Sequence, residues 1–204
     1  MGFFDTIATT ARKTRAVIEM KRLDAAARRY RLTLMESLHG TLQWVMRAQD
    51  GTPDDGVSYG YTLHSGWSVS YPETTGYILQ TFLKYYELFG GEEVLSRARR
   101  MAQWEVHIQM ANGATPGNFG SQRVVPVAFN TGQVLLGWAE YLRRFPEDAK
   151  VRDAAAKAGR WLIECMGSKP WFEGGVSPHA EHGNLSHNSM VSWGLAELGD
   201  VLGD

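Results

Sequence analysis

The 204-residue sequence predicts an all-α fold in which αα-hairpin repeats form a partial α/α toroid. Segments that carry a tryptophan and end at a glycine recur about every 57 residues. Each is followed, after a loop rich in glycine and aromatic residues, by a second segment that also aligns between repeats. Apolar residues in these segments recur every three or four positions, which is the period of a helix and not that of a strand.

The first helix of each repeat is marked by Trp44, Trp104 and Trp161, which are 60 and 57 residues apart. All three segments reach a glycine-bearing turn, and in the first two a glutamine, Gln49 or Gln109, stands just before it. Helices commonly end at glycine, because it adopts the left-handed conformation at little cost. We therefore expect three helices that end at these turns and hold their tryptophans in the core.

The second helix of each repeat begins near Thr75, Thr131 and Asn188, at intervals of 56 and 57 residues. Its tryptophans, Trp138 and Trp193, are also expected in the core. Because the distance between packed helices depends on the side chains at the contact, small residues predict that this helix lies in a crowded inner ring. The small residues are Gly76, Gly132, Gly137, Ser189 and Gly194. An open solenoid is the alternative, but long loops within each repeat favour the toroid.

Composition restricts the classes of partner and compartment. Twenty-one basic and twenty-two acidic side chains give a formal net charge of −1, which argues against nucleic acid binding through bulk charge. A single cysteine, Cys165, excludes an internal disulfide framework and a cysteine-rich zinc site, and is typical of a reducing compartment. No apolar run is long enough for a membrane span or a secretory leader. We expect a cytoplasmic protein without a cofactor.

The chain is expected to divide into an N-terminal amphipathic helical segment, residues 1–35, and a three-hairpin toroid domain, residues 36–204. Basic residues are concentrated in the first segment, at Arg12, Lys13, Arg15, Lys21, Arg22, Arg28 and Arg29. The favoured interpretation is a surface helix with a solvated basic face, and the alternative is binding to a membrane surface or a partner.

Two motifs precede the inner helices: Ser-Tyr-Pro-Glu-Thr-Thr-Gly-Tyr at 70–77 and Phe-Asn-Thr-Gly-Gln at 129–133. With the helix-ending glutamine and the Asp-Gly turn, they resemble the six-hairpin, or (α/α)6, toroid superfamily over residues 40–200. That superfamily includes six-hairpin glycosidases, unsaturated glucuronyl hydrolases, N-acylglucosamine 2-epimerases and the helical domain of glucuronyl C5-epimerases. The resemblance implies a carbohydrate-related activity.

The resemblance also implies an incomplete ring, because a complete toroid in that superfamily has six hairpins and this chain supplies about three. Either the C-terminal half of the toroid is missing or a homodimer closes the ring. A second relative is the squalene-hopene cyclase and prenyltransferase group, whose repeats also carry glutamine and tryptophan. It is disfavoured because the sequence contains no Asp-x-Asp-Asp motif and no cysteine-histidine zinc set.

Residues at the starts of the inner helices are the candidates for catalysis. The repeat offsets make Thr74, Asn130 and His187 equivalent, and in such a ring equivalent positions gather around one axis. Glu73 precedes the first inner helix and is a candidate general acid or base. The alternative is that Glu73 only caps that helix and complements its dipole.

Histidines gather in the third loop, where His179, His182 and His187 lie within nine residues. His182 and His187 are candidates for proton transfer near neutral pH, and solvent-exposed loop histidines are the alternative. No metal site is expected, because the spacing is irregular and the loop has no cysteine.

Aromatic residues in the same loops are the expected sugar contacts, because a sugar stacks its C–H face on a ring while its hydroxyl groups form hydrogen bonds. Trp67, Tyr71 and Trp171 are assigned to this role, together with the amide of Asn130. Arg123 is expected to hold a carboxylate such as that of a uronate, and a surface salt bridge is its alternative.

The sequence thus predicts a carbohydrate-active α/α-toroid protein, of hydrolase or epimerase type, that acts on or binds a glycan or uronate-type sugar. Glu73 has no obvious second acid at the equivalent positions, which weakens a two-carboxylate glycosidase mechanism. A non-catalytic helical-repeat module that binds a partner is the alternative. An isoprenoid cyclase-like enzyme is less favoured, because its funnel would be almost wholly apolar.

Overall fold

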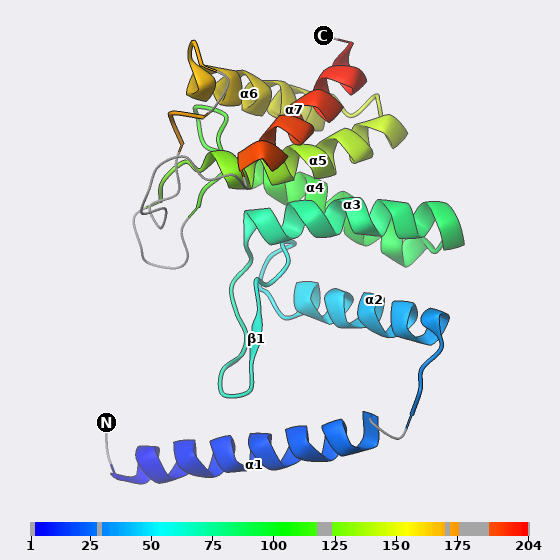
Figure 1. Ribbon diagram of the computed structural model, residues 1–204, viewed down its shortest axis with the longest axis vertical. Helices are drawn as coiled ribbons and strands as arrows, with labels where there is room; N and C mark the ends of the chain where they lie inside the picture. Colours follow the sequence, from blue (N-terminus) through cyan, green and yellow to red (C-terminus); the bar gives the residue numbers. More distant parts are fainter. Residues whose placement is uncertain (1–2, 28–29, 118–123, 170–171, 176–187, 204) are drawn as a thin grey trace.

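The computed structural model describes residues 3–27, 30–117, 124–169, 172–175 and 188–203. Seven α-helices and one short β-hairpin make up this part of the chain (Figure 1). Its only sheet pairs two strands of two residues each, so the predicted all-α class is confirmed. The helices are α1 (Phe3–Ala27), α2 (Leu34–Asp50), α3 (Pro72–Phe89), α4 (Glu92–Ile108), α5 (Ala128–Arg144), α6 (Ala149–Met166) and α7 (Ser189–Leu202); the strands are β1 (Tyr61–Thr62) and β2 (Gly66–Trp67).

The six helices from α2 to α7 are the six that the repeat predicts. We call each succession of outer helix, long loop and inner helix a unit: α2 with α3, α4 with α5, and α6 with α7. The inner helices α3, α5 and α7 lie side by side, and α4 packs against α3 as α6 packs against α5 (Figure 1). Among the described helices, α2 has no extended contact with another helix.

Local sequence explains where several helices begin and end. Thr33 and Glu36 form a capping box at the start of α2, in which each side chain bonds the other residue's backbone N–H. Asp148 caps α6 by accepting a hydrogen bond from the N–H of Val151. The chain turns sharply between α3 and α4 at Gly90 and Gly91, whose φ values of 73° and 106° favour glycine.

The inner helices α3 and α5 approach closely at small residues. A Cβ atom added to Gly76 would lie 2.7 Å from the carbonyl oxygen of Gln133, and one added to Gly137 would lie 2.7 Å from the carbonyl oxygen of Gly76. Both neighbouring atoms belong to the backbone and cannot move without shifting a helix. The glycines are therefore required for this helix spacing, as the sequence predicts.

The same contact recurs one unit later, between α5 and α7. A Cβ atom on Gly132 would lie 2.8 Å from the Cα atom of Val191, and one on Gly194 would meet the carbonyl oxygen of Gly132. The repeat in the sequence is therefore also a repeat of the interface between neighbouring units.

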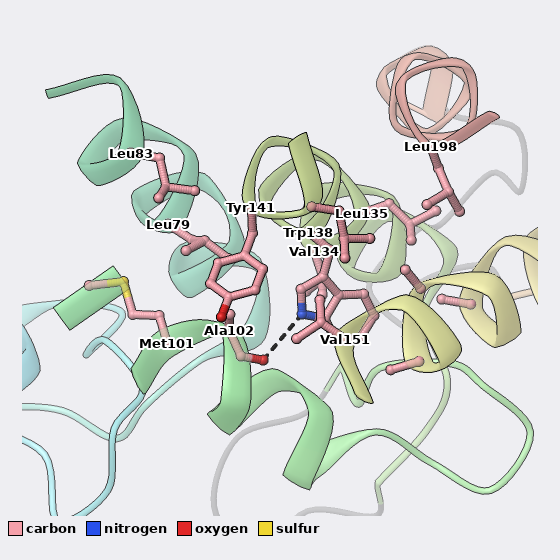
Figure 2. Close-up of a cluster of buried hydrophobic side chains, with 14 of the residues drawn as sticks. Leu79, Leu83, Met101, Ala102, Val134, Leu135, Trp138, Tyr141, Val151 and Leu198 are labelled. Atoms are coloured by element: carbon pink, nitrogen blue, oxygen red, sulfur yellow. Dashed lines mark hydrogen bonds between the residues drawn. The ribbon is translucent and has the colours of Figure 1, made fainter. Parts of the chain in front are cut away.

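The core lies between the inner and outer rows, and Trp138 is at its centre (Figure 2). The indole of Trp138 is fully buried, and its N–H donates to the carbonyl oxygen of Ala102 on α4 at 3.2 Å. Leu79 of α3 and Leu135 of α5 belong to the same core cluster, and both are 0 % exposed. Because it has neighbours on every side, α5 is buried at each position from 130 to 142.

The five helical tryptophans do not share one environment. Trp104, Trp138 and Trp161 are buried as predicted, but Trp44 and Trp193 are each 45 % exposed. The core prediction is therefore wrong for these two. Both stand on terminal helices of the array, α2 and α7, where one flank has no neighbouring helix in the described chain.

The helix-ending glutamines tie each loop to the next outer helix. Gln49 is buried, and its side-chain amide donates to a carbonyl oxygen of its own loop and to one of α4. Gln109 repeats this one unit later, with a carbonyl of its own loop and one of α6. The acceptors are Asp55 at 2.9 Å and Arg97 at 3.4 Å for Gln49, and Gly113 at 2.9 Å and Ala154 at 2.8 Å for Gln109.

The two N-terminal helices are held less firmly than the rest. The last turn of α2 is fixed by Asp50, which accepts a 2.7 Å bond from Arg97 of α4, and this contact lowers the pKa of Asp50. From Lys13 to Ala27 almost every residue of α1 is exposed, and Figure 1 shows α1 on the side of α2 away from α3. None of the described helices combines the length and the apolar character needed to cross a membrane.

Candidate functional site

The loops that lead into α3 and α5 are fixed by the same threonine contact. The backbone N–H of Val57 donates to the hydroxyl of Thr75 at 2.9 Å, and that of Thr115 donates to Thr131 at 3.0 Å. All four residues are fully buried. Because each threonine stands in the first turn of its helix, each loop is fixed at the point where its inner helix begins.

Tyr71 and Asn130 join these two loops. Tyr71 immediately precedes α3, and its hydroxyl donates to the carbonyl oxygen of Gly117 at 3.1 Å. Asn130 lies in the first turn of α5, is 2 % exposed, and donates to the carbonyl oxygen of Pro116 at 3.2 Å. Asn130 also lies close enough to Tyr71 to lower the pKa of the phenol, which partly offsets the rise caused by burial. Two predicted sugar contacts from different units are thus in direct contact.

Glu73 lies beside this pair, as the second residue of α3. Its side chain is half-buried, and burial raises the pKa of its carboxyl group. Its charge in turn raises the pKa values of Tyr71 and Tyr77, although burial is the larger cause for both phenols. Since electrostatic influence of this kind falls off with distance, the three groups lie in one neighbourhood.

Glu73 does not act as a helix cap in the described structure. Its carboxylate forms no hydrogen bond or ion pair with the described residues, and the residue at the cap position, Tyr71, forms none to the helix end through its side chain. An acid in the first turn still interacts favourably with the helix dipole. The carboxyl group is nevertheless left with its hydrogen-bonding capacity available to a ligand.

Trp67 belongs to a second aromatic cluster, on the β1–β2 hairpin. Its ring centroid lies 4.8 Å from that of Trp44 and 4.9 Å from that of Tyr61, and its indole packs on the backbone of Gly51 at the end of α2. These contacts occupy much of the half-buried ring. The described contacts of Trp67 are therefore with the first outer helix and not with Tyr71 or Asn130.

Tyr59 comes two residues before the β1–β2 hairpin, and its ring packs edge to face with that of Tyr71, with 6.4 Å between the ring centroids. Half of its surface is exposed, so it extends the aromatic surface of the site toward solvent. Tyr59 is the loop aromatic residue best placed to stack against a ligand that approaches Tyr71.

Four predicted site residues, His182, His187, Arg123 and Trp171, lie outside the described residues, and their roles stay predictions. The rest of the histidine loop, including His179, is also outside them. Within the described ranges no group of three or more histidine, cysteine, aspartate or glutamate side chains is arranged to hold a metal ion.

Two notable residues were missed by the sequence analysis. Tyr77 follows Glu73 by four positions, and this spacing on a helix would have placed both side chains on one face. Glu105 is completely buried on α4, and neither of its carboxylate oxygens has a partner among the described residues. The repeat aligns Glu105 with Val45 and Leu162, so an acid at an otherwise apolar position was the available signal.

Comparison with protein-family models, with curated proteins and with solved structures found no match to this chain. What is shown is therefore an all-helical protein whose units repeat in sequence and in contact. The likeness to the six-hairpin superfamily rests on the motifs at 70–77 and 129–133.

Proposed function

We propose that this protein is a carbohydrate-active α/α-toroid protein that binds a glycan or uronate-type sugar where the loops lead into α3 and α5. Glu73 is the acid–base group, and Tyr71 and Asn130 shape the site. The proposal is supported chiefly by one observation: Tyr71 and Asn130, which each donate to a carbonyl of the second loop, lie beside a half-buried carboxyl group that has no hydrogen-bond partner among the described residues. Polar groups convergent on an aromatic surface are what a sugar requires.

The environment of Glu73 suits a proton donor. Burial raises the pKa of its carboxyl group, so it keeps its proton to a higher pH than an ordinary glutamate does. A general acid is most effective when its pKa lies near the working pH. The exposed ring of Tyr59 supplies an apolar face next to Tyr71.

A mechanism with two carboxylates has less support than one with a single acid. Among the described residues, the loop acids that would be partners of Glu73 are already engaged: Asp54 accepts from Ser70, and Asp55 pairs with Arg100 at 2.8 Å. Glu173 likewise pairs with Lys169 at 2.6 Å. This arrangement favours an epimerase-type proton transfer, or binding without reaction, over hydrolysis by paired acids.

A non-catalytic helical-repeat module is the second candidate. It is favoured by the exposed aromatic residues of the β1–β2 hairpin, where Tyr61 is 46 % exposed beside Trp44. Such a module binds its ligand but leaves it chemically unchanged. Product analysis therefore separates the two candidates.

The function is tested with a panel of uronate and neutral oligosaccharides, using calorimetry for binding and NMR for products. We expect the wild type to bind a member of the panel and convert it, and Glu73→Gln to retain binding while conversion falls about a hundredfold or more. Glu87→Gln, at an exposed position on the same helix, is the matched control and should behave as wild type.

The pH dependence of conversion is a second test of the role of Glu73. If Glu73 donates a proton, conversion declines as pH rises through its raised pKa, and Glu73→Gln lacks that limb. Failure of every sugar to bind would reject the proposal. Binding without conversion by the wild type would select the non-catalytic candidate, and full activity of Glu73→Gln would remove Glu73 from the mechanism.

A further inference from the structure

In the described part of the chain, the row of inner helices has one flank at α3 and one at α7 that no other inner helix covers. At one flank an apolar cavity of about 330 Å³ lies between α2 and α3, lined mainly by Leu38, Leu42, Val45, Thr81, Tyr85 and Leu88. We call it the α2/α3 groove. At the other flank, Ser189, Ser192 and Ala196 lie exposed along α7, and we call them the α7 face.

The repeated contact between units defines what fits each flank. Gly137 of α5 packs on Gly76 and Leu79 of α3. One unit later the same positions meet again, with Gly194 of α7 packed on Gly132 and Leu135 of α5. In a third contact of the same kind, α7 would take the place that α3 has in the first. Ser189 and Ser192 of the α7 face would then stand in the positions of Gly76 and Leu79.

The opposite surface of that translated contact is the α2/α3 groove. Moving Gly137 back by one interval reaches Thr81 of α3, which lines the groove and is exposed. The α7 face and the groove are therefore the two halves of the interface that the chain already forms twice. Their exposed residues, Thr81, Ser189 and Ser192, are small enough for helices to approach closely.

The outer helices lead to the same conclusion. Each outer helix packs most extensively on the inner helix of the preceding unit, α4 on α3 and α6 on α5. By the same rule α2 requires an inner helix that precedes α3. The groove, with Leu38, Leu42 and Val45 of α2 on one wall, lies where that helix belongs.

Charges across the interface are complementary as well. Lys84 of α3 pairs with Glu140 of α5 at 2.9 Å, and Arg143 of α5 pairs with Glu197 and Asp200 of α7. Translation by one interval brings Glu197 and Asp200 of an incoming α7 opposite Lys84. Each junction therefore includes a base–acid pair, although at the proposed junction Glu87, the neighbour of Lys84, also stands near Asp200.

We propose that the α7 face of one copy of this chain occupies the α2/α3 groove of a second copy. Two copies make this head-to-tail contact reciprocally and form a closed pair, so that every inner helix gains two neighbours. A head-to-tail contact either closes into a ring or continues as an open filament, and two copies that each give one contact and receive one form the smallest closed arrangement. This inference does not depend on the sugar site.

The test is the mass of the full chain in solution, by light scattering and sedimentation over a wide concentration range. We expect twice the 22.8 kDa of one chain. Thr81→Arg in the groove and Ser192→Arg on the α7 face should each give a monomer, because a long charged side chain would be buried in a close helix contact. Both positions are exposed, so circular dichroism should stay unchanged. Ser96→Arg, at an exposed position of α4, is the matched control and should remain a dimer.

Mixing the two variants tests the head-to-tail geometry itself. The Thr81→Arg chain keeps an intact α7 face, and the Ser192→Arg chain keeps an intact groove, so an equimolar mixture should recover association through one contact. A wild-type monomer, or association unaffected by either variant, would overturn the proposal. So would a mixture without recovery, which indicates a contact between like surfaces, or open chains of more than two copies.

Discussion

Glu105 is a carboxyl group placed among apolar side chains of the core. Burial without a hydrogen-bond partner raises its pKa well above the ordinary value of 4.5. Below that ordinary value both the folded and the unfolded chain carry the proton. As the pH rises above it, the unfolded chain releases a proton that the folded chain retains, so the free energy of unfolding falls until the folded pKa is reached.

Glu105→Leu should therefore stabilise the protein. Leucine is the residue that the repeat places at the equivalent position 162, and it removes a buried polar group without partners, which costs about 1–3 kcal/mol. The measurement is urea unfolding at about pH 5 and pH 8, with a gain that is larger at the higher pH. Glu164→Leu, at an exposed site on α6, should change the free energy of unfolding by no more than about 0.5 kcal/mol. A loss of stability at both pH values would contradict this account.

At the scale of residues, the sequence predicts where a side chain stands in the repeat better than it predicts how deeply that side chain is buried. Repeat offsets placed Asn130 at the start of an inner helix near the loop of Tyr71, and both side chains do donate to neighbouring carbonyls of the second loop, those of Pro116 and Gly117. The same offsets wrongly put Trp44 and Trp193 in the core. A repeat position says which way a side chain points, but its burial depends on whether a neighbouring helix exists.

At the scale of elements, helix spacing follows from single glycines. Gly76 and Gly40 both stand within helices, but a Cβ atom at Gly76 meets the α5 backbone, whereas one at Gly40 meets nothing within 4 Å. The same substitution should thus have opposite effects. Gly76→Ala should destabilise by about 1–3 kcal/mol through overpacking, and Gly40→Ala should stabilise by about 0.5–1 kcal/mol through helix propensity.

Urea unfolding of both variants measures this difference directly, and each variant is the control for the other. Equal shifts in the same direction would show that propensity alone governs both sites and that α3 and α5 do not depend on close approach. Helix positions were predictable because glycine turns and apolar periodicity are local properties. The β1–β2 hairpin was not predicted, since Tyr61 and Trp67 pair through a turn without a strong sequence signature.

At the scale of the whole molecule, the stability of each helix depends on how many other helices pack against it. Helix α5 is buried on all sides, whereas the described side chains of α1 are mostly exposed and α2 packs against the core along one face only. Amide hydrogen exchange should therefore be slowest in α5, faster in α2 and fastest in α1. Mass spectrometry of exchanged peptides gives this order, and strong protection of α1 would reveal a contact that the single chain does not provide.

The repeat predicted three units and their inner helices, because periodicity in the sequence reflects periodicity in space. The repeat does not predict whether the units close into a ring, because closure depends on the angle between units and on what covers the end faces. The aromatic cluster around Trp67 was likewise not predicted, because the side chain of its partner Trp44 was expected in the core.

The glutamine contacts give the array a polarity. Gln49 holds the first loop to α4, and Gln109 holds the second loop to α6, so each loop is braced by the unit that follows it in the chain. Loss of the third unit would then loosen the loop of Gln109 while sparing that of Gln49. The geometry of the candidate site therefore depends on the units that follow it in the chain, and removing the last unit would disturb Asn130 before Tyr71.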